Sequence, residues 1–267
     1  MPDAVDRPRA RRRLDHAART WFATAVVGQA AFVLFIVGFF LPPLLQGDPQ
    51  ALNAKPHLTG WVSGDPLGNA HLLMHVFVGA LVTASGLVQL LPTVRRRWPA
   101  VHRWNGRGFM VFAIVATLTG FYLTWVRGSQ LNLPSAVSTS LNGALILVFA
   151  ALAWRSAWRR DIARHREHAL RAWVLVNGVW FLRIGIMLAG LGLAPLGVAI
   201  REDGAVFLAV SFASWLVPLA VVEGYLAAGR SARAGRVRAA AVGLYGLAAL
   251  TAAGSLAAIA FMWWPRL

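Results

Sequence analysis

The sequence predicts an all-α fold, a polytopic membrane helix bundle of about seven transmembrane helices, and three observations support this prediction. Of the 267 residues, 58% are hydrophobic and 13% are charged, whereas soluble domains carry about 25% charged residues. The mean hydropathy is +0.58, which is typical of a chain that lies mostly in lipid. The apolar residues gather in seven runs, each close to the ~20 residues that cross a bilayer core of ~30 Å.

The chain begins with a polar segment, residues 1–20, which carries six arginines together with Pro2 and Pro8. We predict that this segment is a cytoplasmic basic tail, either disordered or lying at the membrane interface. The remaining residues, 21–267, are predicted to form a single transmembrane helical domain. Its first apolar run, 21–45, is longer than the roughly 7–15 residues of a signal-peptide core. We therefore interpret this run as a spanning helix.

The other six spans follow in order along the chain. They are predicted at 69–94, 108–126, 138–154, 170–196, 205–228 and 239–264. Residues 46–68 are rich in Gly, Pro, Asp and Asn, which is typical of a loop. Residues 95–107 form a basic segment that we predict to be a short hairpin between the second and third spans.

The basic residues predict how the bundle is oriented. Twenty-one of them lie in the amino-terminal segment and in three connections on the same side of the membrane, and four lie on the opposite side. Because cytoplasmic loops carry the excess of basic residues, we expect the amino end inside and the carboxyl end outside. A formal charge of +16 can indicate nucleic acid. Here the arginines lie in short loops between apolar runs, so we expect membrane lipids with anionic headgroups as partners at the inner face, and no nucleic acid.

The second predicted span carries a polar seam along one helical stripe. Steps of three and four residues place on this stripe His71, His75, Gly79, Val82, Gly86 and Gln89. His71 and His75 lie one turn apart, a spacing that can place two imidazoles on one metal ion. His57 and Asp65 lie in the preceding loop. The chain has no cysteine and residues 72–74 lack the glutamate of the HExxH motif, which argues against thiolate sites and against a zinc hydrolase.

Arg183 is a charged group deep inside a predicted span, where such groups are usually functional. It lies roughly 20 Å above the inner end of its span, close to the depth of His75, and five turns from His165. We hypothesise that Arg183 and His75 face one interior cavity. The alternative is a structural arginine that donates to backbone carbonyls. For Glu223, the one carboxylate inside a span, the alternatives are an ion pair with Arg183, at a depth ~12 Å away, and the favoured pair with an inner arginine, Arg171 or Arg230.

Three further histidines, His102, His165 and His168, lie at the predicted inner side in two separate segments. Two imidazoles from different helices are the usual axial ligands of a b-type haem, and nearby arginines suit its propionates. The alternative is that His102 and His165 hydrogen-bond to loop carbonyls and orient a basic surface. The sequence leaves both interpretations open.

Together these residues resemble the bacterial membrane family catalogued as domain of unknown function 2306. Its signature combines a histidine in one span, a glutamine near the end of that span, a His-Arg-x-x-Gly hairpin, and a later histidine followed by arginine in the next helix. The matching positions are His75, Gln89, His102, Arg103, Gly106, His165, Arg171 and Arg183. The resemblance covers residues 69–190 and implies a multi-pass protein of the bacterial cytoplasmic membrane, with no established reaction. The Arg-Arg-Trp-Met run common in the family is replaced here at 166–169.

Three functions remain in competition at this point, and the sequence does not decide whether the protein is an enzyme. The first is a redox membrane protein that binds haem b or a quinone-like ligand. Its candidate cofactor-binding residues are His75, His102, His165, Arg103, Arg171, Arg183 and Gln89. The second is a transporter of a small molecule or ion along the seam. The third is a non-catalytic assembly factor that docks lipid or a partner.

Overall fold

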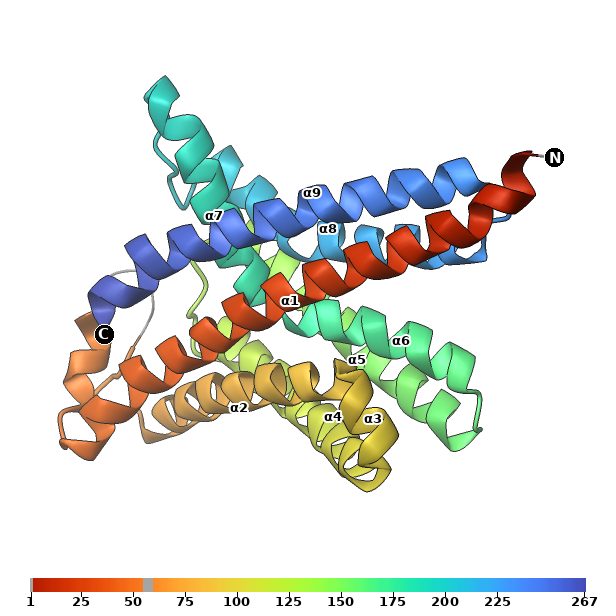
Figure 1. The fold of residues 1–267 in the computed structure, drawn as a ribbon. Helices are drawn as coiled ribbons and strands as arrows, with labels where there is room; N and C mark the ends of the chain where they lie inside the picture. Colours follow the sequence, from red (N-terminus) through yellow and green to blue (C-terminus); the bar gives the residue numbers. More distant parts are fainter. Residues whose placement is uncertain (1, 55–59) are drawn as a thin grey trace.

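The computed structural model describes residues 2–54 and 60–267, and it confirms a bundle of seven helices long and apolar enough to span a membrane (Figure 1). These helices are α1 (Pro2–Leu45), α2 (Pro66–Leu90), α4 (Pro99–Phe121), α5 (Leu133–Trp158), α7 (Gly178–Leu193), α8 (Ala205–Arg230) and α9 (Ala234–Ala257). Two shorter helices, α3 (Pro92–Arg97) and α6 (Ile162–Val176), lie between them. Turns of π-helix, Tyr122–Val126 and Ala258–Trp263, extend α4 and α9. The described residues contain no strand.

Helix starts follow local rules of the sequence. Proline occupies the first turn of α2, α3, α4 and α5, where its missing N–H is not needed. Side chains also cap the free N–H groups of several first turns. Asp65 accepts from Gly68 N at 2.8 Å at the start of α2, and Asn132 accepts from Ser135 N at 2.8 Å at the start of α5. Asp161 caps α6 in the same way.

The amino-terminal segment is part of α1, so residues 2–20 are helical rather than disordered. Ala10, Leu14 and Ala17 are buried in a cluster with residues of α8 and α9. These three residues continue the apolar stripe of the span at helical spacing between the arginines, which accounts for the helix running on. At 1.5 Å per residue the 44 residues of α1 extend ~66 Å, beyond the ~40–45 Å of a whole bilayer.

Helices α1 and α9 lie side by side along most of their length and run in the same direction (Figure 1). Side-chain hydrogen bonds join the two helices in nearly the same register along their length: Asp6 bonds to Arg238, His16 to Tyr245 and Trp21 to Thr251. The buried residues of α9 recur at steps of three and four, at Ala234, Val237, Ala241, Leu244, Ala248, Thr251 and Ser255. This repeat is the pattern of a coiled-coil seam, and its small residues let two membrane helices approach closely.

The segment 95–107 is helical rather than the short hairpin predicted from its charge. Helix α3 ends at Arg97, only Trp98 leaves the helical conformation, and α4 begins at Pro99. Two prolines that each start a helix, Pro92 and Pro99, explain the difference, because each stops the preceding helix while starting the next. As a result His102 and Arg103 lie within the first turns of α4.

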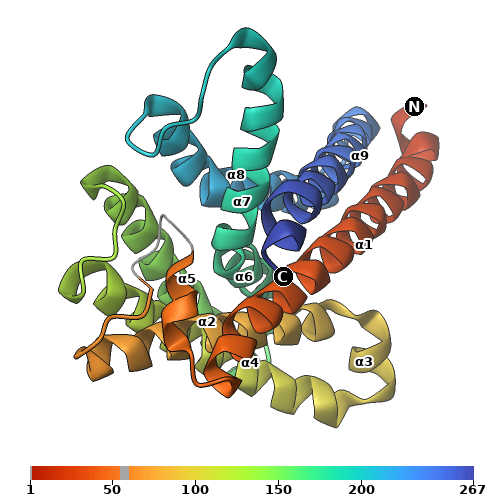
Figure 2. The ribbon, with the colours of Figure 1, turned by 90° about the vertical axis from the view of Figure 1, so that its left-hand side faces the viewer.

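The fifth predicted span, 170–196, is divided in two at Asn177. Helix α7 leaves the line of α6 at this residue, as the two views show (Figures 1 and 2). The five-turn alignment of Arg183 with His165 assumed one continuous helix, so that alignment is wrong. Trp173 of α6 and Trp180 of α7 flank the break and are 3% and 0% exposed. They anchor both sides of the break in the main core of the bundle.

Candidate functional site

The predicted inner end of the bundle brings His102 of α4 and His165 of α6 into electrostatic range of each other. Deeper in the bundle, the side chains of Trp173 on α6 and Phe109 on α4 both pack against Gly86 of α2, which leaves room for them. Two turns separate His102 from Phe109, and about two turns separate His165 from Trp173. Each histidine thus shares a helical face with a residue at this contact.

The two inner histidines differ in their hydrogen bonds. The Nδ1 atom of His165 lies 3.0 Å from the carbonyl oxygen of Ala153 on α5, which fixes the ring and leaves Nε2 outside this bond. The Nδ1 atom of His102 is buried and has no hydrogen-bond partner within residues 2–54 and 60–267. The alternative that these histidines bond to backbone carbonyls therefore applies to His165, although the carbonyl lies in a helix rather than a loop. It does not apply to the Nδ1 atom of His102.

Gln89 acts on the backbone of the site. Its side-chain amide donates to the carbonyl oxygen of His102 at 2.7 Å. In return, the amide of Asn105 on α4 donates to the carbonyl oxygen of Ser85 on α2 at 2.8 Å. These reciprocal bonds fix the rotation of α4 against α2, and with it the position of His102. The structure therefore assigns Gln89 a positioning contact, whereas the sequence suggested contact with a cofactor.

Arg171 and Glu223 form an ion pair, which is one of the two pairs with an inner arginine that the sequence favoured for Glu223. The guanidinium donates to the two carboxylate oxygens at 2.5 and 2.9 Å, and Glu167 lies 3.7 Å away on the other side. The guanidinium also lies over the ring of Phe149 at 5.7 Å. Glu167 in turn accepts from Arg230 at 2.7 Å. This network ties α6 to the inner end of α8, so Arg171 is committed to carboxylates.

Two cations border His102. Arg95 on α3 and Arg103 on α4 both lie within electrostatic range of its imidazole. Arg103 is exposed, and the described residues supply no carboxylate partner to either guanidinium. The neighbouring His168 stacks on Phe149, and its burial, followed by the nearby Arg171, lowers the pKa of its imidazole. The inner histidines therefore sit in a strongly cationic setting.

At the opposite end, His71 and His75 are each hydrogen-bonded to the protein. His71 Nδ1 lies 2.8 Å from the carbonyl oxygen of Leu67, and its ring stacks on Tyr122. His75 Nδ1 lies 2.9 Å from the carbonyl oxygen of Ala116 on α4. In the described part of the chain no group of three or more His, Cys, Asp or Glu side chains is arranged to hold a metal ion. His57 lies outside the described residues.

Arg183 and His75 are placed against different neighbours rather than together. Arg183 donates to the carbonyl oxygen of Val179 at 3.1 Å, and its guanidinium lies 5.0 Å from the centre of the Phe32 ring on α1. His75 instead faces α4. Equal depth in the membrane does not fix the rotation of a helix, and the break at Asn177 turns α7 away from α6. The carbonyl contact of Arg183 agrees with the structural alternative.

Two polar groupings were not recognised from the sequence. In the middle of the bundle, Gln29 of α1 is 0% exposed and neither of its side-chain polar atoms has a partner in the described chain. It is the one amide in the apolar run 21–45, which is a signal that could have found it. At the predicted outer end, Arg127 donates to Asp65 at 2.9 Å and to Asn69 at 2.7 Å. That contact depends on tertiary structure.

Comparison with known proteins gives one match. A family model described as a predicted membrane protein (DUF2306) matches residues 72–226, which is more than half of the chain. The matched region begins between His71 and His75 and extends beyond Glu223, so it contains the polar seam from His75 onward and the inner site. No curated protein and no solved structure matched the sequence.

Proposed function

The chain belongs to the DUF2306 family of predicted membrane proteins, and from this premise we propose that it is a haem-linked redox protein of the bacterial cytoplasmic membrane. The proposed cofactor is haem b, held between His102 on α4 and His165 on α6. The observation that supports it is that imidazoles from two different helices lie within electrostatic range of each other at one end of the bundle. A b-type haem takes its axial ligands in this way.

The hydrogen bonds of the two histidines suit this role. Metal-ligating histidines usually bond through the second ring nitrogen to a backbone carbonyl, which orients the ring. His165 makes such a bond to Ala153. His102 has a buried Nδ1 without a partner in the described chain, so this nitrogen is not committed to a structural bond. Gln89 holds the backbone carbonyl of His102 and acts as a positioning residue.

The surrounding charges suit the anionic propionates of a haem. Arg95 and Arg103 border His102 and have no carboxylate partner among residues 2–54 and 60–267. Arginine binds carboxylates strongly through paired N–H donors. When bound, the haem would supply one-electron transfer. The histidines would fix its orientation, and the arginines would neutralise the charge of its propionates. Arg171, which is paired with Glu223, would hold α6 in position rather than bind the haem.

An optical spectrum tests this proposal directly. The protein is expressed with a haem precursor, purified, and measured in oxidised and reduced form. We expect a Soret band and a reduced α-band. The variants His102→Ala and His165→Ala should each lower the bound haem at least about tenfold, because removal even of groups behind the ligands costs 10–100-fold in affinity. His71→Ala serves as the matched control: this histidine lies at the opposite end of the bundle from His102 and His165, so the variant should retain the bands.

Two results would contradict the proposal: no haem bands after haem-replete expression, or bands that survive both histidine substitutions. In that case transport becomes the leading alternative, and Arg183 is the observation that favours it. Its guanidinium lies in a span and contacts a carbonyl and an aromatic ring rather than a carboxylate. A guanidinium of this kind is a candidate binding group for an anion.

A further inference from the structure

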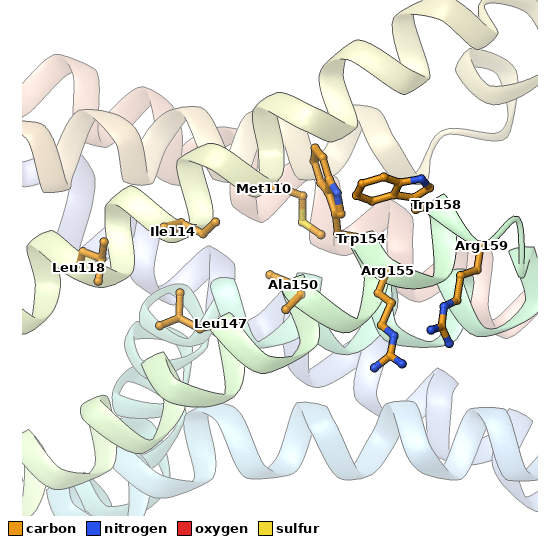
Figure 3. A pocket seen from close by; sticks show the side chains of 10 residues that line it. Met110, Ile114, Leu118, Leu147, Ala150, Trp154, Arg155, Trp158 and Arg159 are labelled. Carbon is orange, nitrogen blue, oxygen red and sulfur yellow. The ribbon is translucent and has the colours of Figure 1, made fainter.

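A groove of about 770 Å³ lies between α4 and α5, and neither His102 nor His165 lines it. Met110, Ile114 and Leu118 line it from α4, at helical spacing, and Leu147, Ala150 and Ala151 line it from α5. The two helices separate toward one end, so that the groove widens there (Figure 3). Ile114 and Leu118 are 42% and 53% exposed, so the groove opens on the lipid-facing surface of the bundle.

The wide end of the groove is amphipathic. Trp154 and Trp158 extend from one side of α5, and Arg155 and Arg159 extend together from the other (Figure 3). Tryptophan is enriched where a membrane protein meets the headgroup region. Arg155 and Arg159 are one turn apart and both line this end of the groove, with their guanidinium groups on the side of the helix away from the tryptophans (Figure 3).

Several arginines near Arg155 and Arg159 are bonded to other side chains. Arg164, Arg166 and Arg171 bond to Asp161, Tyr225 and Glu223 respectively. For Arg155 and Arg159 no ion pair or side-chain hydrogen bond is made with any residue that the structure describes. Two guanidinium groups on one helical face, both free to bind, complement a phosphate.

The length of the groove matches one leaflet. Twelve residues of α5 separate Leu147 from Arg159, which is ~18 Å of helix. Half of a bilayer core is ~15 Å. A phospholipid whose phosphate lies at Arg159 can therefore extend an acyl chain along the groove as far as Leu147, near the middle of the membrane.

We propose that the groove between α4 and α5 is a specific site for an anionic phospholipid, with its phosphate on Arg155 and Arg159 and an acyl chain along Met110, Ile114 and Leu147. Trp154 and Trp158 flank the glycerol region. The site does not depend on haem, so the two proposals fail separately. It also differs from the general attraction of a basic membrane face, because it requires both the cationic pair and the apolar groove.

Native mass spectrometry of the purified full-length protein in detergent tests the site. The protein is titrated with phosphatidylglycerol, and with phosphatidylcholine of the same acyl chains. We expect phosphatidylglycerol to bind more tightly. The double substitution Arg155→Gln/Arg159→Gln should weaken its binding on the order of tenfold, given the contribution of each arginine to anionic lipid binding. Ala151→Phe should weaken binding by filling the groove. Because Ala151 is exposed, we expect this variant to fold normally.

Each variant has a matched control. Arg96→Gln/Arg97→Gln removes the same charge on the same predicted side but outside the groove, and Ala157→Phe adds the same ring at an exposed position of α5 that does not line it. Both controls should bind phosphatidylglycerol like the wild type. Equal binding of the two lipids, normal binding in either groove variant, or equal loss in groove and control variants would overturn the proposal.

Discussion

Asp65 has two roles, and both depend on its charge. One carboxylate oxygen caps α2 through Gly68 N, and the other accepts from Arg127 at 2.9 Å. Arg127 also donates to the carbonyl oxygen of Gly60 and to the side chain of Asn69. Any Cβ at Gly68 would overlap the Asp65 carboxylate, so this close approach requires glycine. A single carboxylate thus joins the first loop, the start of α2 and the end of α4.

We predict that Asp65→Asn lowers the melting temperature at pH 7, since it removes the carboxylate charge that is paired with the guanidinium of Arg127, whose side chain is 5% exposed. The Gly68 N–H, and then Arg127, hold the pKa of the Asp65 carboxyl below its usual range. For an acid with a lowered folded-state pKa, the stabilisation is complete above the unfolded pKa of about 4 and is lost as the pH falls through the folded value.

The measurement is therefore the melting temperature of wild type and variant between pH 3 and pH 7. Their difference should be largest near pH 7 and should shrink below about pH 4. Asp203→Asn is the control, because the paired side chains of Arg201 and Asp203 are 75% and 68% exposed, and exposed ion pairs contribute little to stability. A gap between wild type and Asp65→Asn that grows on acidification would contradict this account.

The residues also show how far sequence reasoning reaches at this scale. The pair Arg171–Glu223 was predictable, since a carboxylate near a cationic helix end has few other partners. The contact of Gln89 with the His102 carbonyl was not, because it depends on how α2 and α4 are rotated against each other. Likewise, depth along a helix gave similar levels for Arg183 and His75 without giving their directions.

At the scale of helices, α1 and α9 depend on small residues at their contact. Gly28 of α1 lies where α7 and α9 converge: a Cβ there would come 2.5 Å from Ser255 Oγ and 2.8 Å from Trp180 Cζ2. Trp180 is fully buried, so it has no room to move. The seam between α1 and α9 is thus also the place where α7 docks.

We predict that Gly28→Leu destabilises the protein by about 1–3 kcal/mol or more through overpacking. This corresponds to a loss of several degrees in melting temperature. Gly246→Leu is the matched control, since nothing lies within 4 Å of a Cβ at this exposed position of α9. The measurement is thermal unfolding of both purified variants in the same detergent. Equal melting temperatures for the two variants would show that the convergence at Gly28 is not tight.

The division of the fifth span shows why some of the fold was missed. The apolar run 170–196 is long enough for one helix, and length was the criterion for a span. The dipeptide Asn177-Gly178 is a turn signal, but an apolar run does not reveal whether neighbouring helices stabilise a bend. Here they do, because Trp173 and Trp180 pack in the core on either side. Conversely, the arginines of 2–20 and 95–107 suggested loops, although helical stripes and prolines favoured helices.

In the whole molecule, the two ends of the bundle differ in charge and in structure. The extended amino-terminal part of α1 packs on α8 and α9 at the end of the bundle that carries most of the arginines. The π-helical end of α9, with Trp263 and Trp264, lies at the other end, near the carboxyl terminus (Figure 1). Arginine in excess on one side is the usual mark of the cytoplasmic face. The orientation itself remains a prediction.

The orientation is testable because the chain contains no cysteine, so a single introduced cysteine is the only one labelled. Ala232→Cys lies in the connection from α8 to α9, and Gln130→Cys lies in the connection from α4 to α5; both positions are exposed. A membrane-impermeant maleimide is applied to intact bacterial cells without an outer-membrane barrier, and to lysed cells. We expect Gln130→Cys to react in intact cells and Ala232→Cys only after lysis, since the second lies among four arginines. The opposite pattern would place the inner histidines, Arg155 and Arg159 at the outer face, and would move the proposed haem and lipid sites to the other leaflet.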